Sequence, residues 1–303
     1  MNPRILVSGA SGLVGSALVP SLKASGAQVT RLARGKAVPP AADGEAQIPW
    51  DPAQPISPEA VSGFDAVIHL AGESIVGRWT DAKKARIRDS RILATTNLAQ
   101  ALGQAREKPG VFLSASAIGY YGNRADEVLK EESSSGTGFA ADLARDWEAA
   151  TVSSAAAGIR TVQTRIGIVM GANGGALQSM LTPFKMGLGG RVGNGRQWMS
   201  WIDLQDVVGA IHHILKTDLL QGPVNLVAPK PVTNAEFTRT LASVLSRPAI
   251  FPMPAFAARL AFGQMADELL LASQRVEPTQ LIASGYPFRF RELRASLQGI
   301  LGR

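Results

Sequence analysis

The stretch Ile5-Leu-Val-Ser-Gly9-Ala-Ser-Gly12-Leu-Val-Gly15 joins an apolar run to regularly spaced glycines, and an apolar segment follows it. This order predicts a buried strand, a tight turn and a helix. Glycines suit such a turn because its backbone dihedrals are unusual, a pyrophosphate must approach the main chain, and the helix must pack closely on the strand. We therefore expect a dinucleotide site at the helix N-terminus. Its predicted residues are Gly9, Ser11, Gly12, Leu13, Val14 and Gly15.

The glycine spacing is Gly-x-x-Gly-x-x-Gly, which differs from the Gly-x-Gly-x-x-Gly of the dehydrogenase fingerprint and indicates another branch of the same fold. The next strand is expected over residues 27–32. In NAD sites an acidic residue at the end of that strand binds the ribose hydroxyls. Here no acidic residue precedes Asp43, and Arg31 and Arg34 stand in that place. A guanidinium is the fork-shaped partner of a phosphate, so the pair predicts NADP as the cofactor; a solvated arginine pair is the alternative.

Composition limits the class of protein. The chain has 303 residues, of which 46% are hydrophobic, enough for one large α/β core or for a core with a smaller lobe. It has no cysteine, which excludes disulfides and thiolate catalysis, and its three histidines form no visible metal motif. No apolar stretch approaches the roughly 20 residues of a membrane helix. We expect a cytoplasmic protein with no metal and no membrane partner.

A net charge of +7 raises the possibility of nucleic-acid binding. The basic residues cluster at 83–91 and 289–294, outside any known nucleic-acid motif, and solvated helix faces explain them better. We therefore expect a small-molecule substrate, no nucleic acid, and a monomer or homodimer. A basic mouth for an anionic cofactor or substrate accounts for the remaining charge.

Later segments alternate between predicted strands and helices. Residues 36–63 suggest an irregular connection, and 64–72 a buried strand with a turn that passes beneath the cofactor. That turn supplies Leu70, Ala71 and Gly72 as predicted cofactor contacts. Glu73 follows and either faces the reaction centre or has a surface or helix-capping role.

Two further strands carry candidate chemistry. The strand at 110–116 brings Ser116 to its carboxyl end, with Tyr120 and Tyr121 just beyond it. Helices are expected at 80–102 and 139–150, and the strand at 161–170 contains Arg165, a further predicted cofactor residue. The alternation predicts an α/β fold, a Rossmann-type doubly wound parallel sheet.

The segment that begins at Gly171 is rich in glycine. We expect an NADP-binding domain over 1–170, to which 203–228 returns, and a smaller C-terminal α/β lobe from 171–202 and 229–303. A glycine-rich run inside the lobe has no Gly-Lys-Ser/Thr and is no nucleoside triphosphate loop. The run contains the residues of a predicted substrate wall; aromatic anchors between the lobes are the alternative. The residues of this wall are Arg191, Arg196, Trp198 and Trp201.

With these pieces in order, the chain resembles the extended short-chain dehydrogenase/reductases, the nucleotide-sugar epimerase-like proteins. It is most similar to an atypical family of epimerase family or cell-division-inhibitor-like proteins with a C-terminal accessory domain of unknown function. The resemblance covers essentially the whole chain, and it implies an NADP-binding Rossmann fold. It rests on Gly9–Gly15, His69–Gly72, Gly77–Thr80, Asp89–Arg91, Ser114–Gly122, Arg145–Glu148, Arg165, Gly189-Gly190, Gly195–Asp203, Gly222–Leu226 and Ser273–Val276.

One departure governs the mechanism. The superfamily uses a serine and a Tyr-x-x-x-Lys helix, in which lysine lowers the pKa of the tyrosine. Ser116 matches that serine, but the corresponding helix carries a packing stripe of Phe139, Leu143 and Trp147, and Tyr-x-x-x-Lys occurs nowhere in the chain. Two hypotheses follow. Either the protein is an NADP-dependent oxidoreductase or epimerase-like enzyme, or it binds NADP(H) without turnover as a redox sensor or a division-related interaction protein. In the first case Ser116 polarises a carbonyl, and the proton group is Tyr120, Tyr121 or Glu73.

Overall fold

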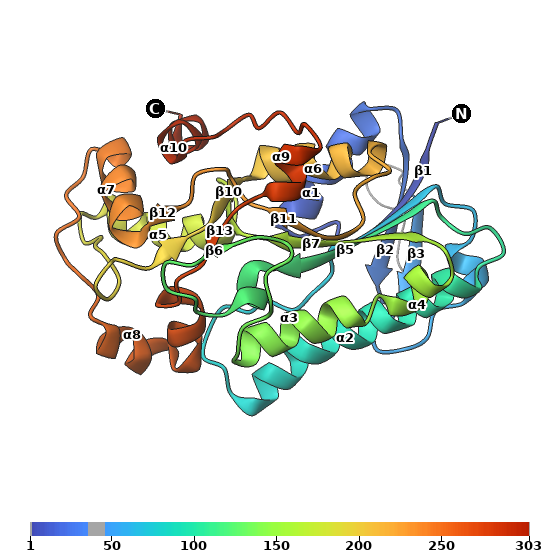
Figure 1. Ribbon diagram of the computed structural model, residues 1–303, viewed down its shortest axis with the longest axis horizontal. Coiled ribbons are helices and arrows are strands. Elements are labelled where there is room, and N and C mark those ends of the chain that lie inside the picture. Colours follow the sequence, from blue (N-terminus) through green and yellow to red (C-terminus); the bar gives the residue numbers. More distant parts are fainter. Residues whose placement is uncertain (1, 36–45, 303) are drawn as a thin grey trace.

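Seven parallel strands form the central sheet of the computed structural model, which describes residues 2–35 and 46–302. Their order is β11-β7-β5-β4-β1-β2-β3, with the chain crossing over between neighbours (Figure 1). This is the doubly wound Rossmann arrangement, as the alternation of strands and helices predicts. The strands are β1 (Arg4–Ser8), β2 (Gln28–Arg34), β3 (Ala46–Trp50), β4 (Ala66–His69), β5 (Val111–Ala117), β7 (Arg160–Ile166) and β11 (Gly222–Leu226).

Helices cover both faces of the sheet. One face carries α1 (Leu13–Ala24), α6 (Leu204–Lys216) and α9 (Thr279–Ala283), and the other carries α2 (Asp81–Gln104), α3 (Phe139–Ala149) and α4 (Val152–Ala156) (Figure 1). Side chains alternate along a strand, so β1 sends Ile5 and Val7 into the core beneath α1 and α6 and Leu6 into the core beneath α2. The apolar run at the chain's start is therefore buried on both sides.

The edge strand β3 lies inside the segment that the sequence suggests is an irregular connection. That expectation is wrong for residues 46–50, and a 3-10 helix over Pro58–Val61 follows. Pro49 makes the strand hard to predict from the sequence, because proline cannot donate a ladder hydrogen bond. Proline is tolerated in strands at sheet edges, and β3 is an edge strand. Trp50 at its end is only 3% exposed. The acidic residue Asp43 lies outside the described residues.

The C-terminal part adds helices and short two-stranded sheets. Its core is built around Trp201, Phe237 and Leu241. Leu281 and Tyr286 pack on the other side, in the core beneath α1 and α6. The remaining elements of the chain, some of them short segments that precede the C-terminal part, are η2 (Ile118–Tyr121), β6 (Val128–Leu129), β8 (Ile168–Met170), α5 (Gly175–Lys185), β9 (Trp198–Met199), β10 (Trp201–Asp203), β12 (Val232–Thr233), α7 (Asn234–Leu245), α8 (Ala255–Phe262), η3 (Ala266–Leu270), β13 (Arg275–Val276) and α10 (Leu293–Leu301).

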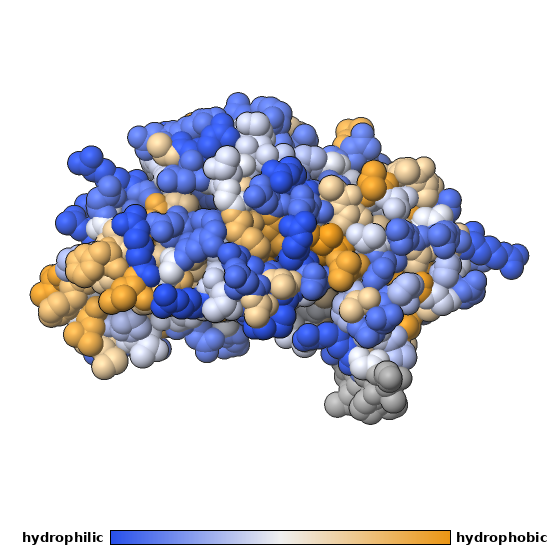
Figure 2. All heavy atoms as spheres, turned by 90° about the horizontal axis from the view of Figure 1, so that it is seen from below, coloured by the Kyte–Doolittle hydropathy of each residue, from blue (hydrophilic) through white to orange (hydrophobic). Residues whose placement is uncertain are grey.

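The surface of this part is unevenly apolar. Figure 2 shows apolar side chains gathered at its left end, where α8 lies in Figure 1. Phe256 and Leu260 of α8 are 72% and 77% exposed. Within residues 2–35 and 46–302, no helix has the length and apolar content that crossing a membrane requires.

Candidate functional site

The glycine turn between β1 and α1 has no room for side chains. Gly9 has φ +69°, and a Cβ there would lie 2.6 Å from the carbonyl carbon of Leu70. A Cβ on Gly15 would lie 2.2 Å from the carbonyl oxygen of Gly9. The Gly12 amide donates to that same oxygen at 3.0 Å. The close approach of backbone to backbone thus requires glycine at the first and third positions and leaves the main chain bare toward the cavity.

The N-terminus of α1 is free of side-chain caps. Gly12 is the N-cap residue, no side chain caps it, and the first turn contains no acidic residue. Amide groups at a helix N-terminus need acceptors, and the helix dipole favours an anion there. This end of α1 has the features of a phosphate-binding helix N-terminus.

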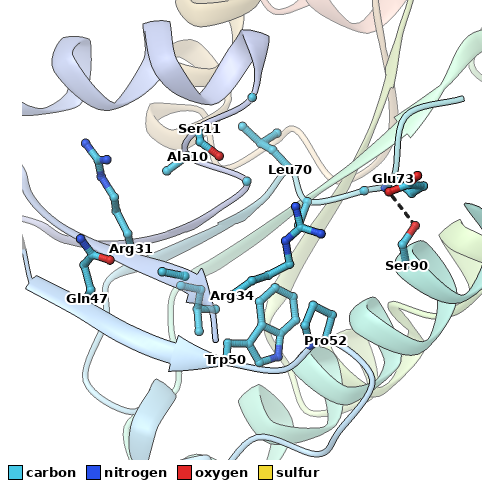
Figure 3. A pocket seen from close by; sticks show the side chains of 16 residues that line it. Ala10, Ser11, Arg31, Arg34, Gln47, Trp50, Pro52, Leu70, Glu73 and Ser90 are labelled. Carbon is cyan, nitrogen blue, oxygen red and sulfur yellow. Dashed lines mark hydrogen bonds between the residues drawn. The ribbon is translucent and has the colours of Figure 1, made fainter. Parts of the chain in front are cut away.

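A cavity of about 470 Å³ opens beside this turn. In Figure 3, Arg34 lies between Trp50 and the loop at Leu70, and Arg31 stands beside Gln47 at the other end. The structure therefore brings both predicted phosphate-binding arginines to one cavity with the glycine turn. The lining residues are Gly9, Ala10, Ser11, Gly12, Arg31, Leu32, Ala33, Arg34, Gln47, Trp50, Pro52, Leu70, Ala71, Gly72, Glu73 and Ser90.

Sequence reasoning missed part of this lining. Gln47 and Trp50 belong to β3, and Pro52 follows it. The distinctive run Trp50-Asp51-Pro52 was the available signal, but without a predicted strand it had no place in the fold. Leu13, Val14 and Gly15 do not line the cavity; they begin α1, and Gly15 serves by its close backbone contact.

Glu73 stands at the rim of the cavity as an ion-pair partner. Its carboxylate accepts from Lys83 Nζ at 3.0 Å, which lowers its pKa. Its backbone amide donates to Ser90 Oγ (Figure 3), and its carbonyl accepts from Arg91. A carboxylate held in its ionised form is a poor proton donor near neutral pH, which weighs against a general-acid role.

Ser116 belongs to a separate buried network. Its hydroxyl donates to Glu148 Oε1 at 2.7 Å, and it is 3% exposed. Two nitrogens of Arg165 bind the two oxygens of Glu148, each at 2.8 Å. Arg165 is itself 3% exposed and does not line the described cavity, so its contacts are with protein groups rather than with the expected cofactor site. The serine hydroxyl is directed at a carboxylate, not at open space.

The two neighbouring tyrosines differ in their surroundings. Tyr121 is fully buried; its hydroxyl donates to Asn225 at 2.7 Å and accepts from Arg165 at 2.9 Å. Burial raises the pKa of Tyr121 to about 12. Tyr120 is only partly buried, and its ring stacks on the Arg165 guanidinium at 3.5 Å. Of the two, Tyr120 has the accessible surface that proton exchange with a ligand requires.

The helix that carries Tyr-x-x-x-Lys in the superfamily is occupied by packing residues. Phe139 meets Trp79 edge to face at 5.0 Å, and Leu143 is 7% exposed. Trp147 donates to Thr95 at 2.9 Å. The apolar stripe seen in the sequence is thus a true packing face of α3.

The predicted substrate wall is split by the structure. Trp201 is fully buried and donates to the Lys230 carbonyl at 3.0 Å, which is an anchoring role. Trp198 is partly buried, and its indole donates to Asp126 at 2.9 Å. The arginines of this wall, Arg191 and Arg196, are exposed. In the described ranges, histidine and acidic residues do not gather in groups of three that fit a metal ion.

Comparison with known proteins gives the family. A model of the NAD dependent epimerase/dehydratase family matches residues 5–226, and a domain of unknown function, DUF1731, matches 253–300. Epimerase family protein Mb2239 of Mycobacterium bovis is 41% identical over 298 residues, which cover 98% of this chain and 97% of that protein. The chain belongs to the NAD dependent epimerase/dehydratase family. This confirms the extended short-chain dehydrogenase/reductase resemblance and the unassigned C-terminal domain.

Solved structures support this epimerase-family fold. Human epimerase family protein SDR39U1, crystallised with NADPH, superposes with a TM-score of 0.88 at 34% identity, covering 99% of each chain. UDP-glucose 4-epimerase of Thermus thermophilus, in complex with NAD, has a TM-score of 0.76 at 21% identity and shows the shared fold alone. The fold class predicted from the sequence is confirmed.

Proposed function

We propose that this epimerase-family protein binds NADP(H) in the cavity beside the glycine turn. The observation that carries the proposal is the meeting of three features in one cavity: a bare glycine backbone, an uncapped helix N-terminus, and two arginines. The backbone amides would hold the pyrophosphate, and Arg31 and Arg34 would hold the 2′-phosphate. The human relative crystallised with NADPH supports the choice of cofactor.

The reaction proposed is NADP(H)-dependent reduction, oxidation or epimerisation of an anionic carbonyl or sugar-nucleotide-like compound. The nicotinamide supplies or accepts the hydride when bound. The phenol of Tyr120 gives or takes the proton, since Tyr121 is sealed off and Glu73 is ion-paired. Ser116 contributes to the reaction only indirectly, through the hydrogen bond that its hydroxyl donates to the Glu148 carboxylate. The exposed Arg191 and Arg196 favour an anionic substrate.

The test follows NADPH oxidation and NADP reduction at 340 nm with a panel of anionic carbonyls, alcohols and sugar nucleotides. Sugar nucleotide epimers are separated by chromatography, since epimerisation leaves the cofactor unchanged. Turnover by the wild type and its loss in Tyr120→Phe support the enzyme. Tyr121→Phe is the matched control and keeps measurable turnover. An unchanged rate in Tyr120→Phe would contradict the role of that phenol.

A second candidate is a non-catalytic NADP(H)-binding sensor or interaction protein, cytoplasmic like the enzyme. It is favoured by the packing of α3, where Phe139 and Leu143 fill the places of the superfamily's acid–base pair. It predicts that NADPH binds and protects the chain from unfolding while no compound of the panel is converted. Sustained conversion of any of them would exclude it.

A further inference from the structure

Residues 273–276, Ser-Gln-Arg-Val, contact two segments that are far apart in the sequence and that carry Tyr120 and Trp198. They belong to the matched domain of unknown function. On one side is the turn η2 with Tyr120, here called the tyrosine turn (residues 118–122); on the other is β9 with Trp198. We call residues 273–276 the bracket segment.

The tyrosine turn is held by a single side chain of the bracket segment. The amide nitrogen of Gln274 donates to the carbonyl of Ile118 at 3.1 Å and to the carbonyl of Gly122 at 3.1 Å. These carbonyls belong to the first and last residues of the turn, so one planar amide group binds both ends of it. A primary amide has two N–H donors, which matches the two acceptors.

The same segment holds β9. The Gln274 backbone amide donates to the Trp198 carbonyl at 3.1 Å, and the Trp198 amide donates to Ser273 Oγ at 3.0 Å. The Arg275 guanidinium lies over the Trp198 ring, 4.6 Å from its centroid. Backbone and side-chain contacts thus fix this strand and its indole from the same segment that fixes the tyrosine turn.

Further contacts make the connection stiff. The Gln274 carbonyl accepts from Ser200 Oγ at 2.8 Å, and the same hydroxyl accepts from the Val276 amide at 2.9 Å. Ser273 Oγ donates to the carbonyl of Ala125. The bracket segment is therefore hydrogen-bonded to residues next to the tyrosine turn and next to β9 as well as to these two elements themselves.

We propose that Gln274 is a positioning residue: its side-chain amide fixes the tyrosine turn at a set distance from Trp198, so that the C-terminal domain completes the substrate site. The inference rests on the proposed function in assigning proton transfer to Tyr120, and it adds that the substrate lies between Tyr120 and Trp198 of the predicted substrate wall. It gives the domain of unknown function a physical role, which is to set the geometry of the proton-transferring turn rather than to bind cofactor. Gln274 does not line the cofactor cavity.

The experiment uses the small number of tyrosines. The chain has three, Tyr120, Tyr121 and Tyr286, so 3-fluorotyrosine incorporation gives a ¹⁹F NMR spectrum that Tyr→Phe variants assign. The test variants are Gln274→Glu and Gln274→Met, which keep the shape of the side chain and lack both donors. The matched control is Gln280→Glu, an exposed glutamine nearby whose side chain makes no described hydrogen bond.

We expect the Tyr120 resonance to shift and broaden in both Gln274 variants and to stay in place in the control. Tyr286 packs in the core beneath α1 and α6 and reports whether the fold is intact. An unmoved Tyr120 resonance in either variant would overturn the proposal, and so would an equal change of all three resonances, which would make Gln274 a general stability residue.

Cofactor binding separates this proposal from the proposed function. The spectra are recorded without NADPH, and calorimetry then measures NADPH affinity in the same samples. We expect the affinity of the Gln274 variants to equal that of the wild type. Absence of NADPH binding in the wild type would remove the proposed function and leave the tyrosine result standing; a loss of NADPH affinity confined to the Gln274 variants would overturn the separation of roles inferred here.

Discussion

Two regions at the carboxyl edge of the sheet are built differently: the dinucleotide end, with the glycine turn at residues 9–15 and its cavity, and the tyrosine end, with Ser116 and the tyrosine turn. At the dinucleotide end, backbone geometry dictates the residues: glycines stand where any Cβ would strike the main chain. At the tyrosine end, the polar groups face one another instead of open space. Ser116, Glu148 and Arg165 form a closed network beneath Tyr120, and α3 packs the apolar side chains of its stripe, Phe139, Leu143 and Trp147, against its neighbours.

The difference teaches what each end contributes to the protein. A phosphate cradle is made of backbone and tolerates few substitutions. At the other end, side chains brought together by packing, the Arg165–Glu148 ion pair and the apolar stripe of α3, contribute to the stability of the scaffold. We therefore expect mutations at the two ends to separate into effects on cofactor binding and effects on stability.

The largest expected effect lies at the tyrosine end. Arg165→Met leaves the mostly buried Glu148 carboxylate without its partner, and breaking a buried pair costs about 3–5 kcal/mol. Urea unfolding should show this loss, while the folded fraction keeps its NADPH affinity. Arg88→Met is the control, since its pair with Asp146 is more exposed and is worth about 0–1 kcal/mol. Equal losses in the two variants would contradict the network.

At the dinucleotide end, Gly15→Ala should abolish NADPH binding. Its Cβ would lie 2.2 Å from the Gly9 carbonyl oxygen, so the turn must shift, at a cost of about 1–3 kcal/mol in unfolding free energy. Calorimetry and urea unfolding measure the two effects. Gly110→Ala is the control, because its Cβ would meet nothing nearer than 3.6 Å. Wild-type affinity in Gly15→Ala would refute the close-approach argument.

Arg34→Ala should weaken NADPH binding and leave NADH binding alone. One charge-assisted hydrogen bond contributes about 1.5–3 kcal/mol, so the NADPH Kd should rise roughly ten- to hundredfold. Isothermal calorimetry with both cofactors measures this, with the exposed Arg106→Ala as control. A matching loss for NADH would mean that Arg34 supports the adenosine portion and not the 2′-phosphate.

The glycine turn can be predicted from the sequence, whereas the edge strand β3 cannot. Gly9, Gly12 and Gly15 predicted the turn because a local strand, turn and helix pattern determines it. Edge strand β3 escaped because Pro49 and the surrounding Pro, Ala and Gly hide its pattern. The only sequence signal for the part of the cavity that β3 lines was therefore the short run Trp50-Asp51-Pro52.

The tyrosine end shows why side-chain roles resist prediction. Tyr120 and Tyr121 are adjacent and chemically identical in the sequence, and only the packing of the turn makes one accessible and the other sealed. Glu148 of α3 contacts Ser116 of β5, and no spacing in the sequence predicts that contact. Long-range polar networks of this kind come from tertiary packing, which a motif does not contain.

The smallest expected effect is a pH dependence from Glu131. Burial raises the pKa of this carboxyl, and one of its oxygens has no hydrogen-bond partner in the described structure. A raised folded pKa means that the folded state binds the proton more tightly, so stability is full below the unfolded pKa near 4.5 and declines as pH rises through the folded value.

Glu131→Gln removes that titration. Urea unfolding at a series of pH values should show a wild type that loses stability, relative to the variant, as the pH rises above about 4.5. Glu107→Gln is the control, because Glu107 is exposed and is not among the groups that shift the pKa of Glu131. Parallel pH profiles for wild type and Glu131→Gln would show that Glu131 titrates as it does in the unfolded chain.

The cofactor preference of the wild-type chain is the most direct test of the contrast between the two ends. Calorimetric titration with NADPH and with NADH, at the same ionic strength, compares the 2′-phosphate with a hydroxyl in the intact cavity. We predict that NADPH binds at least about tenfold more tightly, from the arginine contacts. Equal affinities would contradict the assignment of Arg31 and Arg34, and no binding of either would contradict the cradle itself.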